Sequence, residues 1–319
     1  MSKPKLALYW AASCGGCEIA VLDIEEKILE VDANFEIVFW PCVMDPKYKD
    51  VQAMPDKSID LCLFNGGIRT SENKKMAELL REKSQVLVAF GSCAHEGCIP
   101  GLANLYSKDS LFKRVYKETP TTENSDGVYP QPVTKVPEGE LEIPEFQEKL
   151  VPLSAVVPVD YTIPGCPPQP HQIWAVLEHI IQGKALPPQG SVLGAGLKTC
   201  CDECPRTREE KKIKRFYRPH EIIPNETQCL LDQGIVCCGP ATRSGCGGLC
   251  VKVGIPCRGC YGAAPESPDQ GAKMMAALSS VIDSQDPDEI EQIVNSVADP
   301  VGTFYRFSLA GSMLGRNRK

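Results

Sequence analysis

Several features that mark other classes of protein are missing or rare in this 319-residue sequence. No run of about 18 apolar residues occurs, so we expect no membrane-spanning helix and no membrane insertion. The opening residues lack the apolar stretch and small-residue cleavage site of a signal peptide, which predicts a cytoplasmic protein. Basic residues are outnumbered by acidic ones, and the net charge of −7 argues against nucleic acid as a partner.

Histidine is scarce, with four residues, whereas cysteine is abundant, with 17. Disulfides rarely persist in a reducing cytoplasm, so a surplus of thiols indicates metal binding. With so few imidazoles, any metal site must be built mostly from thiolates. Such sites suit zinc or iron–sulfur clusters rather than magnesium, calcium or non-haem iron. Ten of the cysteines lie between Cys200 and Cys260, and seven precede them.

The first part of the chain alternates between strand-like and helix-like segments. The expected strands are apolar on both faces, as in a parallel sheet that is covered by helices on both sides. We therefore predict an α/β fold with a doubly wound parallel sheet. The expected strands are 5–9, 36–40, 60–64, 85–90 and 157–163, and the expected helices are 17–31, 71–83 and 167–181.

Two departures from this pattern predict the domain organisation. Residues from about 107 to 157 are rich in Pro, Thr, Glu and Lys without a long periodic stretch, so we interpret them as an irregular surface insertion. After residue 190 the composition shifts to Gly, Cys and Pro, which cannot build a good apolar core alone. We predict a first domain over residues 1–190. A second domain, stabilised by clusters, covers residues 191–319 and ends in helices that begin near 267 and 286.

Four cysteines of the first domain directly follow expected strands. Cys14 and Cys17 follow the first strand, Cys93 follows the fourth, and Cys166 follows the last. Loops after parallel strands meet at the carboxyl edge of the sheet, where such folds bind ligands. Four thiolates in one place suit a cubane iron–sulfur cluster, and adjacent glycines let the backbone approach its sulfides. The remaining thiols of this part we interpret as small buried residues without a metal role; they are Cys42, Cys62 and Cys98.

The cysteines after residue 199 suffice for two further four-thiol sites, with two thiols spare. A pair of structural zinc sites is the alternative, with the two Cys-x-x-Cys pairs as knuckles. That arrangement leaves four cysteines of the same region without a role, so the spacing favours clusters. The four are Cys229, Cys237, Cys246 and Cys250.

The order and the neighbours of these cysteines resemble the small subunit of nickel–iron hydrogenases. Within that family the chain is most similar to the cytoplasmic methyl-viologen-reducing type found with heterodisulfide reductase. The resemblance covers nearly the whole chain. It rests on Cys14-Gly-Gly-Cys17-Glu18, Pro41-Cys-Val-Met-Asp45, Gly66-Gly67-Ile68, Gly91-Ser-Cys93-Ala94, Ile163-Pro-Gly-Cys166-Pro-Pro168, Cys201-Asp-Glu-Cys204-Pro205-Arg206, Cys237-Cys-Gly-Pro240, Gly245-Cys246-Gly247-Gly248 and Pro256-Cys-Arg-Gly-Cys260-Tyr261.

This resemblance implies a flavodoxin-like first domain and a role as the electron-transfer subunit of a hydrogenase, an enzyme that oxidises or evolves hydrogen. It implies that no catalytic residue lies in this chain, because the nickel–iron site belongs to a separate large subunit. Electrons would pass to a downstream iron–sulfur or flavin subunit, including one of the heterodisulfide reductase type. The implied cofactors are three [4Fe–4S] clusters: a proximal one on Cys14, Cys17, Cys93 and Cys166, a medial one on Cys246, Cys250, Cys257 and Cys260, and a distal one on Cys201, Cys204, Cys229 and Cys237.

Some alternatives stay open at this point. Cys201 occupies the place of a histidine that often binds the distal cluster in that family, and Cys200 or Cys238 could replace the chosen neighbour at either distal position. Glu18 follows a predicted ligand; a role in proton or electron transfer near the subunit interface is one interpretation, and we favour the other, a helix-start carboxylate that interacts with the helix dipole. A flavodoxin-like iron–sulfur oxidoreductase without hydrogenase activity is the competing function. It is disfavoured because the loop after the first strand carries cysteines in place of a phosphate-binding sequence.

Overall fold

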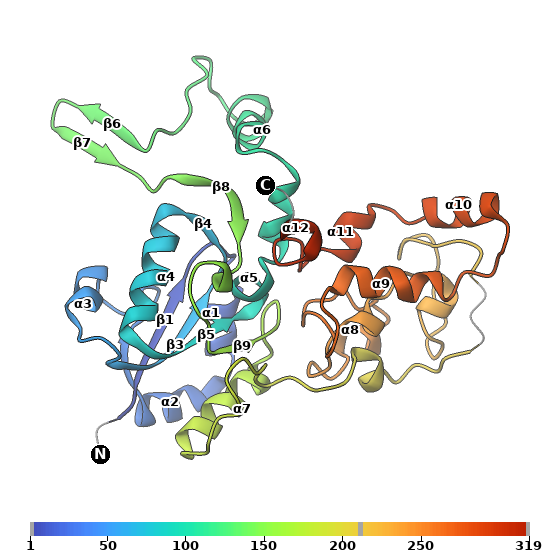
Figure 1. Ribbon diagram of the computed structural model, residues 1–319, viewed down its shortest axis with the longest axis horizontal. Coiled ribbons are helices and arrows are strands. Elements are labelled where there is room, and N and C mark those ends of the chain that lie inside the picture. The colour runs from blue at the N-terminus through green and yellow to red at the C-terminus, as the bar shows by residue number, and fades with distance from the viewer. Residues whose placement is uncertain (1–2, 210–212, 317–319) are drawn as a thin grey trace.

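The computed structural model describes residues 3–209 and 213–316 and is centred on a parallel sheet of five strands (Figure 1). The strands lie in the order β2-β1-β3-β5-β9, and each neighbouring pair is parallel. This is the 2-1-3-4-5 order of flavodoxin-like doubly wound folds, so the predicted fold class is confirmed. The strands are β1 (Lys5–Trp10), β2 (Glu36–Phe39), β3 (Ile59–Asn65), β5 (Ser84–Phe90) and β9 (Tyr161–Ile163).

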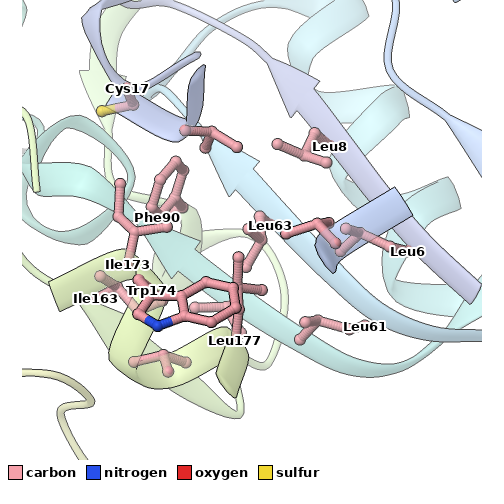
Figure 2. Close-up of a cluster of buried hydrophobic side chains, with 14 of the residues drawn as sticks. Leu6, Leu8, Cys17, Leu61, Leu63, Phe90, Ile163, Ile173, Trp174 and Leu177 are labelled. Atoms are coloured by element: carbon pink, nitrogen blue, oxygen red, sulfur yellow. The ribbon is translucent and has the colours of Figure 1, made fainter. Parts of the chain in front are cut away.

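Alternate residues of the central strands point to opposite faces of this sheet, and each face has its own apolar core. On one face Leu6, Leu63 and Phe90 pack with Trp174 and Leu177 of α7 (Figure 2). The helices that contribute to this core are α1 (Gly16–Leu22), α2 (Ile28–Asn34) and α7 (Pro170–Ile181). The opposite core is formed with α3 (Tyr48–Ala53), α4 (Ser71–Lys83) and α5 (Gly91–Glu96).

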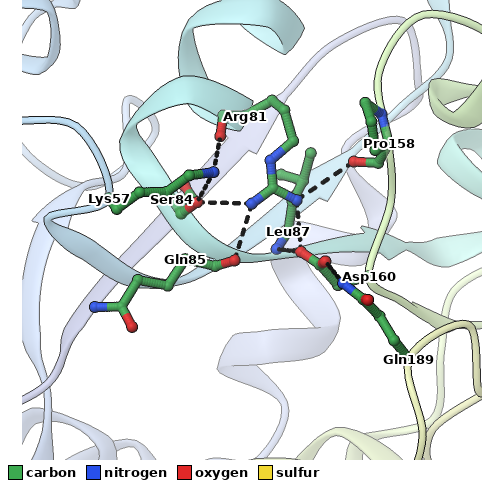
Figure 3. Close-up of polar contacts among 8 residues, drawn as sticks. All are labelled: Lys57, Arg81, Ser84, Gln85, Leu87, Pro158, Asp160 and Gln189. Carbon is green, nitrogen blue, oxygen red and sulfur yellow. Dashed lines mark hydrogen bonds and ion pairs between the residues drawn. The ribbon is translucent and has the colours of Figure 1, made fainter.

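A buried ion pair fixes β9 to the edge of the sheet (Figure 3). Asp160 accepts hydrogen bonds from Arg81 at 2.5 Å and from the backbone N–H of Leu87 at 2.7 Å. Arg81 also donates to the carbonyl of Ser84 at 2.7 Å. Because Cys166 follows β9, this network sets where that cysteine leaves the sheet.

The helix predicted over residues 17–31 is interrupted. Helix α1 ends at Leu22, a 3₁₀ turn covers Glu25–Lys27, and α2 begins at Ile28. Glu25 has a φ of +60°, which lies outside the right-handed helical region and explains the break.

The segment predicted as an irregular insertion contains regular structure, which corrects that prediction. It holds α6 (Lys108–Lys113) and the antiparallel hairpin β6 (Val133–Val136)–β7 (Gly139–Glu142), which projects away from the sheet (Figure 1). A further strand, β8 (Phe146–Val151), pairs with β4 (Ile68–Thr70). The hairpin strands are short and mostly exposed, so they show no apolar alternation. The turn Pro137-Glu138-Gly139 was the available signal.

The residues after 190 form a compact body with little sheet, whose core mixes apolar side chains with cysteines. Residues 307–311 return to the end of α5: the N–H of Cys98 donates to the carbonyl of Phe307 at 3.0 Å, and the N–H of Gly311 donates to the carbonyl of Glu96 at 3.1 Å. Within the described residues, no helix has the length and apolar character needed to cross a membrane. The helices of this part are α8 (Leu249–Lys252), α9 (Gln270–Ser279), α10 (Pro287–Asn295), α11 (Pro300–Phe304) and α12 (Met313–Arg316).

Candidate cluster-binding sites

The first set of thiols lies at the carboxyl edge of the sheet, as the sequence predicts. Cys14 and Cys17 follow β1, Cys93 is in α5 after β5, and Cys166 follows β9. Burial raises the pKa of the Cys17 thiol, and the neighbouring thiols of Cys166 and Cys14 raise it further. Cys93 is buried in a small group of side chains, and the partly buried Cys166 packs against this group. Segments far apart in the sequence therefore deliver these thiols to one place.

A fifth thiol joins this set, which the sequence analysis did not predict. Cys98 is only 1% exposed, and its Sγ lies 3.5 Å from the Sγ of Cys166. The available signal was its position five residues after Cys93, just beyond the end of α5. Cys62 is fully buried in the apolar core, in agreement with a small core residue. Cys42 is exposed, so the interpretation of that thiol as a buried small residue was wrong.

The predicted distal thiols line a single cavity of about 80 Å³ between the 3₁₀ turn Cys200–Glu203 and the turn that begins at Gly239. These four thiols are Cys201, Cys204, Cys229 and Cys237. Cys200 also lines this cavity, whereas Cys238 does not. The Sγ of Cys238 instead faces the carbonyl of Thr303 at 3.9 Å.

The predicted medial thiols surround the beginning of α8 and the turn that follows it. Burial raises the pKa of Cys250 and of Cys260, and in both cases the thiols of Cys257 and Cys246 raise it further. Hydrogen bonds with Cys246 and Cys257 raise the pKa of Cys200. Cys200 therefore contacts this set as well as the distal cavity, a double position that sequence spacing does not reveal.

The three sets are joined by two hydrogen bonds. The hydroxyl of Ser92, beside Cys93, donates to the carbonyl of Cys260 at 2.5 Å. The N–H of Cys257 donates to the Sγ of Cys237 at 3.2 Å. The set formed by Cys246, Cys250, Cys257 and Cys260 therefore lies between the other two.

Glycines leave space beside the sulfur atoms of two sets. A Cβ added at Gly91 would stand 2.4 Å from the Sγ of Cys17, and one added at Gly239 would stand 2.9 Å from the Sγ of Cys201. Backbone without side chains can therefore approach these thiols, which fits a group bulkier than one ion. Among residues 3–209 and 213–316, no three His, Cys, Asp or Glu side chains are grouped as for a single metal ion.

Glu18 is more than a helix-start carboxylate. It is buried in the first turn of α1, where it accepts hydrogen bonds from the indole N–H of Trp40 at 2.5 Å and from the amide of Asn65 at 3.3 Å. Burial raises its pKa, although the bonds from Trp40 and Asn65 act in the opposite direction. Glu18 thus connects α1 to Trp40, which directly follows β2, and to the end of β3.

Comparisons with known proteins show which family the chain belongs to. The family profile of the 20 kDa subunit of NADH ubiquinone oxidoreductase matches residues 14–180. The chain is 42% identical over 318 residues to the iron–sulfur subunit of the F420-non-reducing hydrogenase of Archaeoglobus profundus, and covers 98% of both proteins. It is 34% identical over 317 residues to the corresponding hydrogenase subunit of Methanothermobacter marburgensis, with 98% of this chain and 96% of that protein covered.

Among solved structures, a chain of an NAD⁺-reducing [NiFe]-hydrogenase in the H2-reduced state matches with a TM-score of 0.49 and 26% identity. The match covers 58% of this chain and 96% of that one. The two hydrogenase subunits that align over nearly their whole length show which family this chain belongs to. The chain belongs to the small, iron–sulfur subunits of F420-non-reducing hydrogenases, and it is an electron-transfer subunit of a hydrogenase complex whose active site lies on a partner chain.

Proposed function

We propose that this chain holds three [4Fe–4S] clusters in a row and relays electrons between the catalytic large subunit and a downstream redox subunit. The proposed ligands are Cys14, Cys17, Cys93 and Cys166 (proximal), Cys246, Cys250, Cys257 and Cys260 (medial), and Cys201, Cys204, Cys229 and Cys237 (distal). Such clusters supply one-electron carriers whose potentials depend on charge, hydrogen bonds to sulfur and burial.

One observation carries this proposal: the four distal thiols line one cavity, although they come from segments up to 36 residues apart in the sequence. Burial raises the pKa of one thiol in each set, Cys17, Cys237 and Cys260, so these thiols hold their protons until a metal displaces them. Grouped, buried thiols of this kind favour metal ligation over a set of independent core cysteines.

We propose that the large subunit docks beside Cys14. Cys14 is the exposed thiol of the proximal set. Three apolar side chains of β1 and α1 are exposed nearby in the sequence, with exposed fractions of 43% for Trp10, 58% for Ile19 and 44% for Leu22. Exposed apolar side chains of this size are typical of surfaces that another protein covers. The distal cavity is the proposed exit, toward an iron–sulfur or flavin subunit, including one of the heterodisulfide reductase type.

We further propose a domain boundary near residue 190 and a cytoplasmic location. The boundary is supported by the two separate groups of apolar side chains on either side of it. The location is supported by the absence of disulfides: all 17 cysteines are free thiols.

Single Cys→Ser variants of the native complex test the ligand sets. Cys204→Ser should lose the distal EPR signal and up to about four of about twelve irons, with the other signals unchanged. The matched control is Cys42→Ser, which changes an exposed thiol outside every set and should keep the full iron content. Equal iron content in both variants would refute the distal assignment, and tightly bound zinc without acid-labile sulfide would refute the clusters.

A further inference from the structure

An arginine lies at the distal cavity together with the four thiols. Arg208 lines the cavity, and its Nη2 donates a hydrogen bond to the Sγ of Cys201 at 3.2 Å. In the parts of the chain that the structure describes, this is the one hydrogen bond its guanidinium makes. The side chain is therefore committed to the sulfur and not to a carbonyl or a carboxylate.

The second arginine of the cavity has a different role. The Nε of Arg206 donates to the carbonyl of Val251 at 2.9 Å, and its Nη1 donates to the carbonyls of Asn225 and Gln228 at 2.8 and 3.0 Å. These bonds join three separate backbone segments around the cavity. Arg206 therefore maintains the shape of the cavity, whereas Arg208 acts on its sulfur.

The backbone on both sides of Arg208 is anchored, which directs its side chain. The N–H of Thr207 donates to the carbonyl of Thr227 at 2.8 Å, and the N–H of Cys229 donates to the carbonyl of Thr207 at 2.7 Å. On the other side, the N–H of Glu209 donates to the carboxylate of Asp232 at 2.8 Å. Arg208 is held between these two anchors, so the approach to Cys201 does not depend on a free loop.

Two thiols and one carboxylate lie around the guanidinium. Partial burial lowers the pKa of Arg208, but the thiols of Cys201 and Cys229 and, more weakly, Asp232 raise it, and the net direction is upward. An arginine guanidinium stays protonated in proteins, so Arg208 is a fixed positive charge. Asp232 is the nearby opposing charge, and one of its carboxylate oxygens is buried without a hydrogen-bond partner.

We infer that Arg208 is a positioning and tuning residue of the distal set, which raises the reduction potential of the cluster that this set holds. This inference rests on the proposed function. Adding one electron to a cluster held by this set would make or break no bond, and the added negative charge would be spread over the cluster and its thiolate ligands. A guanidinium hydrogen-bonded to one of these sulfurs stabilises the reduced state more than the oxidised state. The higher reduction potential would favour electron transfer to the distal set, from which electrons would leave for the downstream subunit.

The test is an anaerobic redox titration of the native complex, followed by EPR, with wild type, Arg208→Gln and Arg208→Lys. The glutamine variant keeps a donor but loses the charge, so the distal midpoint potential should shift to a more negative value. Lysine keeps the positive charge but lacks the planar guanidinium, so the distal midpoint potential of Arg208→Lys should lie between those of wild type and Arg208→Gln. The difference between wild type and Arg208→Gln should decrease as ionic strength rises, because Arg208 is exposed.

Arg215→Gln is the matched control, since it also removes one guanidinium, which is paired with Glu221 at 3.0 Å and does not line the cavity. It should leave all potentials unchanged. An unchanged distal midpoint in Arg208→Gln with full iron content, or an equal shift in Arg215→Gln, would overturn the inference but leave the relay intact. If Arg208→Gln loses the distal EPR signal, the distal midpoint potential of Arg208→Lys decides. A midpoint more negative than that of wild type supports the inference, and a midpoint equal to that of wild type overturns it. A wild-type complex without any distal signal would overturn the proposed function as well.

Discussion

Replacing Gly91 with alanine should remove the proposed proximal cluster and leave the other two proposed clusters in place. Gly91 begins α5 with a φ of +80°, and a Cβ added there would stand 2.4 Å from the Sγ of Cys17. Ordinary contact with a Cβ begins at 3.4 Å, so the thiol must retreat by about 1 Å. The carbonyl of Gly165 and the ring of Pro168 surround the same position and limit other adjustments.

The size of this displacement decides the outcome. Metal–ligand distances in proteins hold to within about 0.2 Å, so a shift of about 1 Å takes Cys17 out of ligation. The left-handed backbone adds about 1–2 kcal/mol against alanine. We therefore expect the purified complex to lose up to about four of about twelve irons, together with the proximal EPR signal.

Iron and acid-labile sulfide analysis after anaerobic purification measures this loss, and circular dichroism checks that the sheet is folded. Gly190→Ala is the matched control, because Gly190 has a φ of +88° and an added Cβ would meet nothing within 4 Å. Gly190→Ala therefore has a similar conformational cost for alanine at positive φ, but its new Cβ contacts no thiol. Full iron content in Gly91→Ala, or the same loss in Gly190→Ala, would refute the reasoning.

The ion pair and the buried core thiol provide further tests. Asp160→Asn should lower the free energy of unfolding at pH 7 by about 2–3 kcal/mol, measured with urea, because Arg81 loses its carboxylate partner but keeps carbonyl acceptors. Burial alone would raise the pKa of Asp160, but the hydrogen bonds from Arg81 and Leu87 hold it below its usual value. Its contribution is therefore present above about pH 4 and lost as the pH falls through the lowered pKa, so the difference between wild type and variant should shrink at about pH 3. A difference independent of pH would contradict this. Burial raises the pKa of the Cys62 thiol to about 12, so a thiol reagent at pH 8 should leave it unlabelled in the folded protein. Cys62→Ala should keep all iron, and loss of a cluster signal in that variant would show that this cysteine is not a plain core residue.

Most of the sheet could be predicted from the sequence because its strands are apolar on both faces. The segments 60–64 and 85–90 became β3 and β5 with shifts of one residue at their ends. Placing Cys14, Cys93 and Cys166 at one edge followed from the parallel arrangement alone. The hairpin β6–β7 was missed because its short strands are exposed and bury no apolar face.

The directions of individual side chains were beyond sequence reasoning. Cys200 contacts a second thiol set through tertiary contacts that sequence spacing does not show, whereas the position of Cys98, five residues after Cys93, was a signal that the sequence analysis did not use. Arg208 lies in a stretch of charged residues whose sequence is typical of an exposed surface segment. Its contact with Cys201 depends on the hydrogen bonds that hold the neighbouring residues in place. Such contacts depend on tertiary closure and not on a local pattern.

The central claim is that this chain carries three iron–sulfur clusters and no nickel. Metal and sulfide analysis of the native complex, purified without oxygen and with its subunits separated afterwards, tests it most directly. The account predicts about twelve irons with matching sulfide on this chain and nickel on the large subunit. Zinc without sulfide on this chain, or nickel that remains with it, would contradict the account.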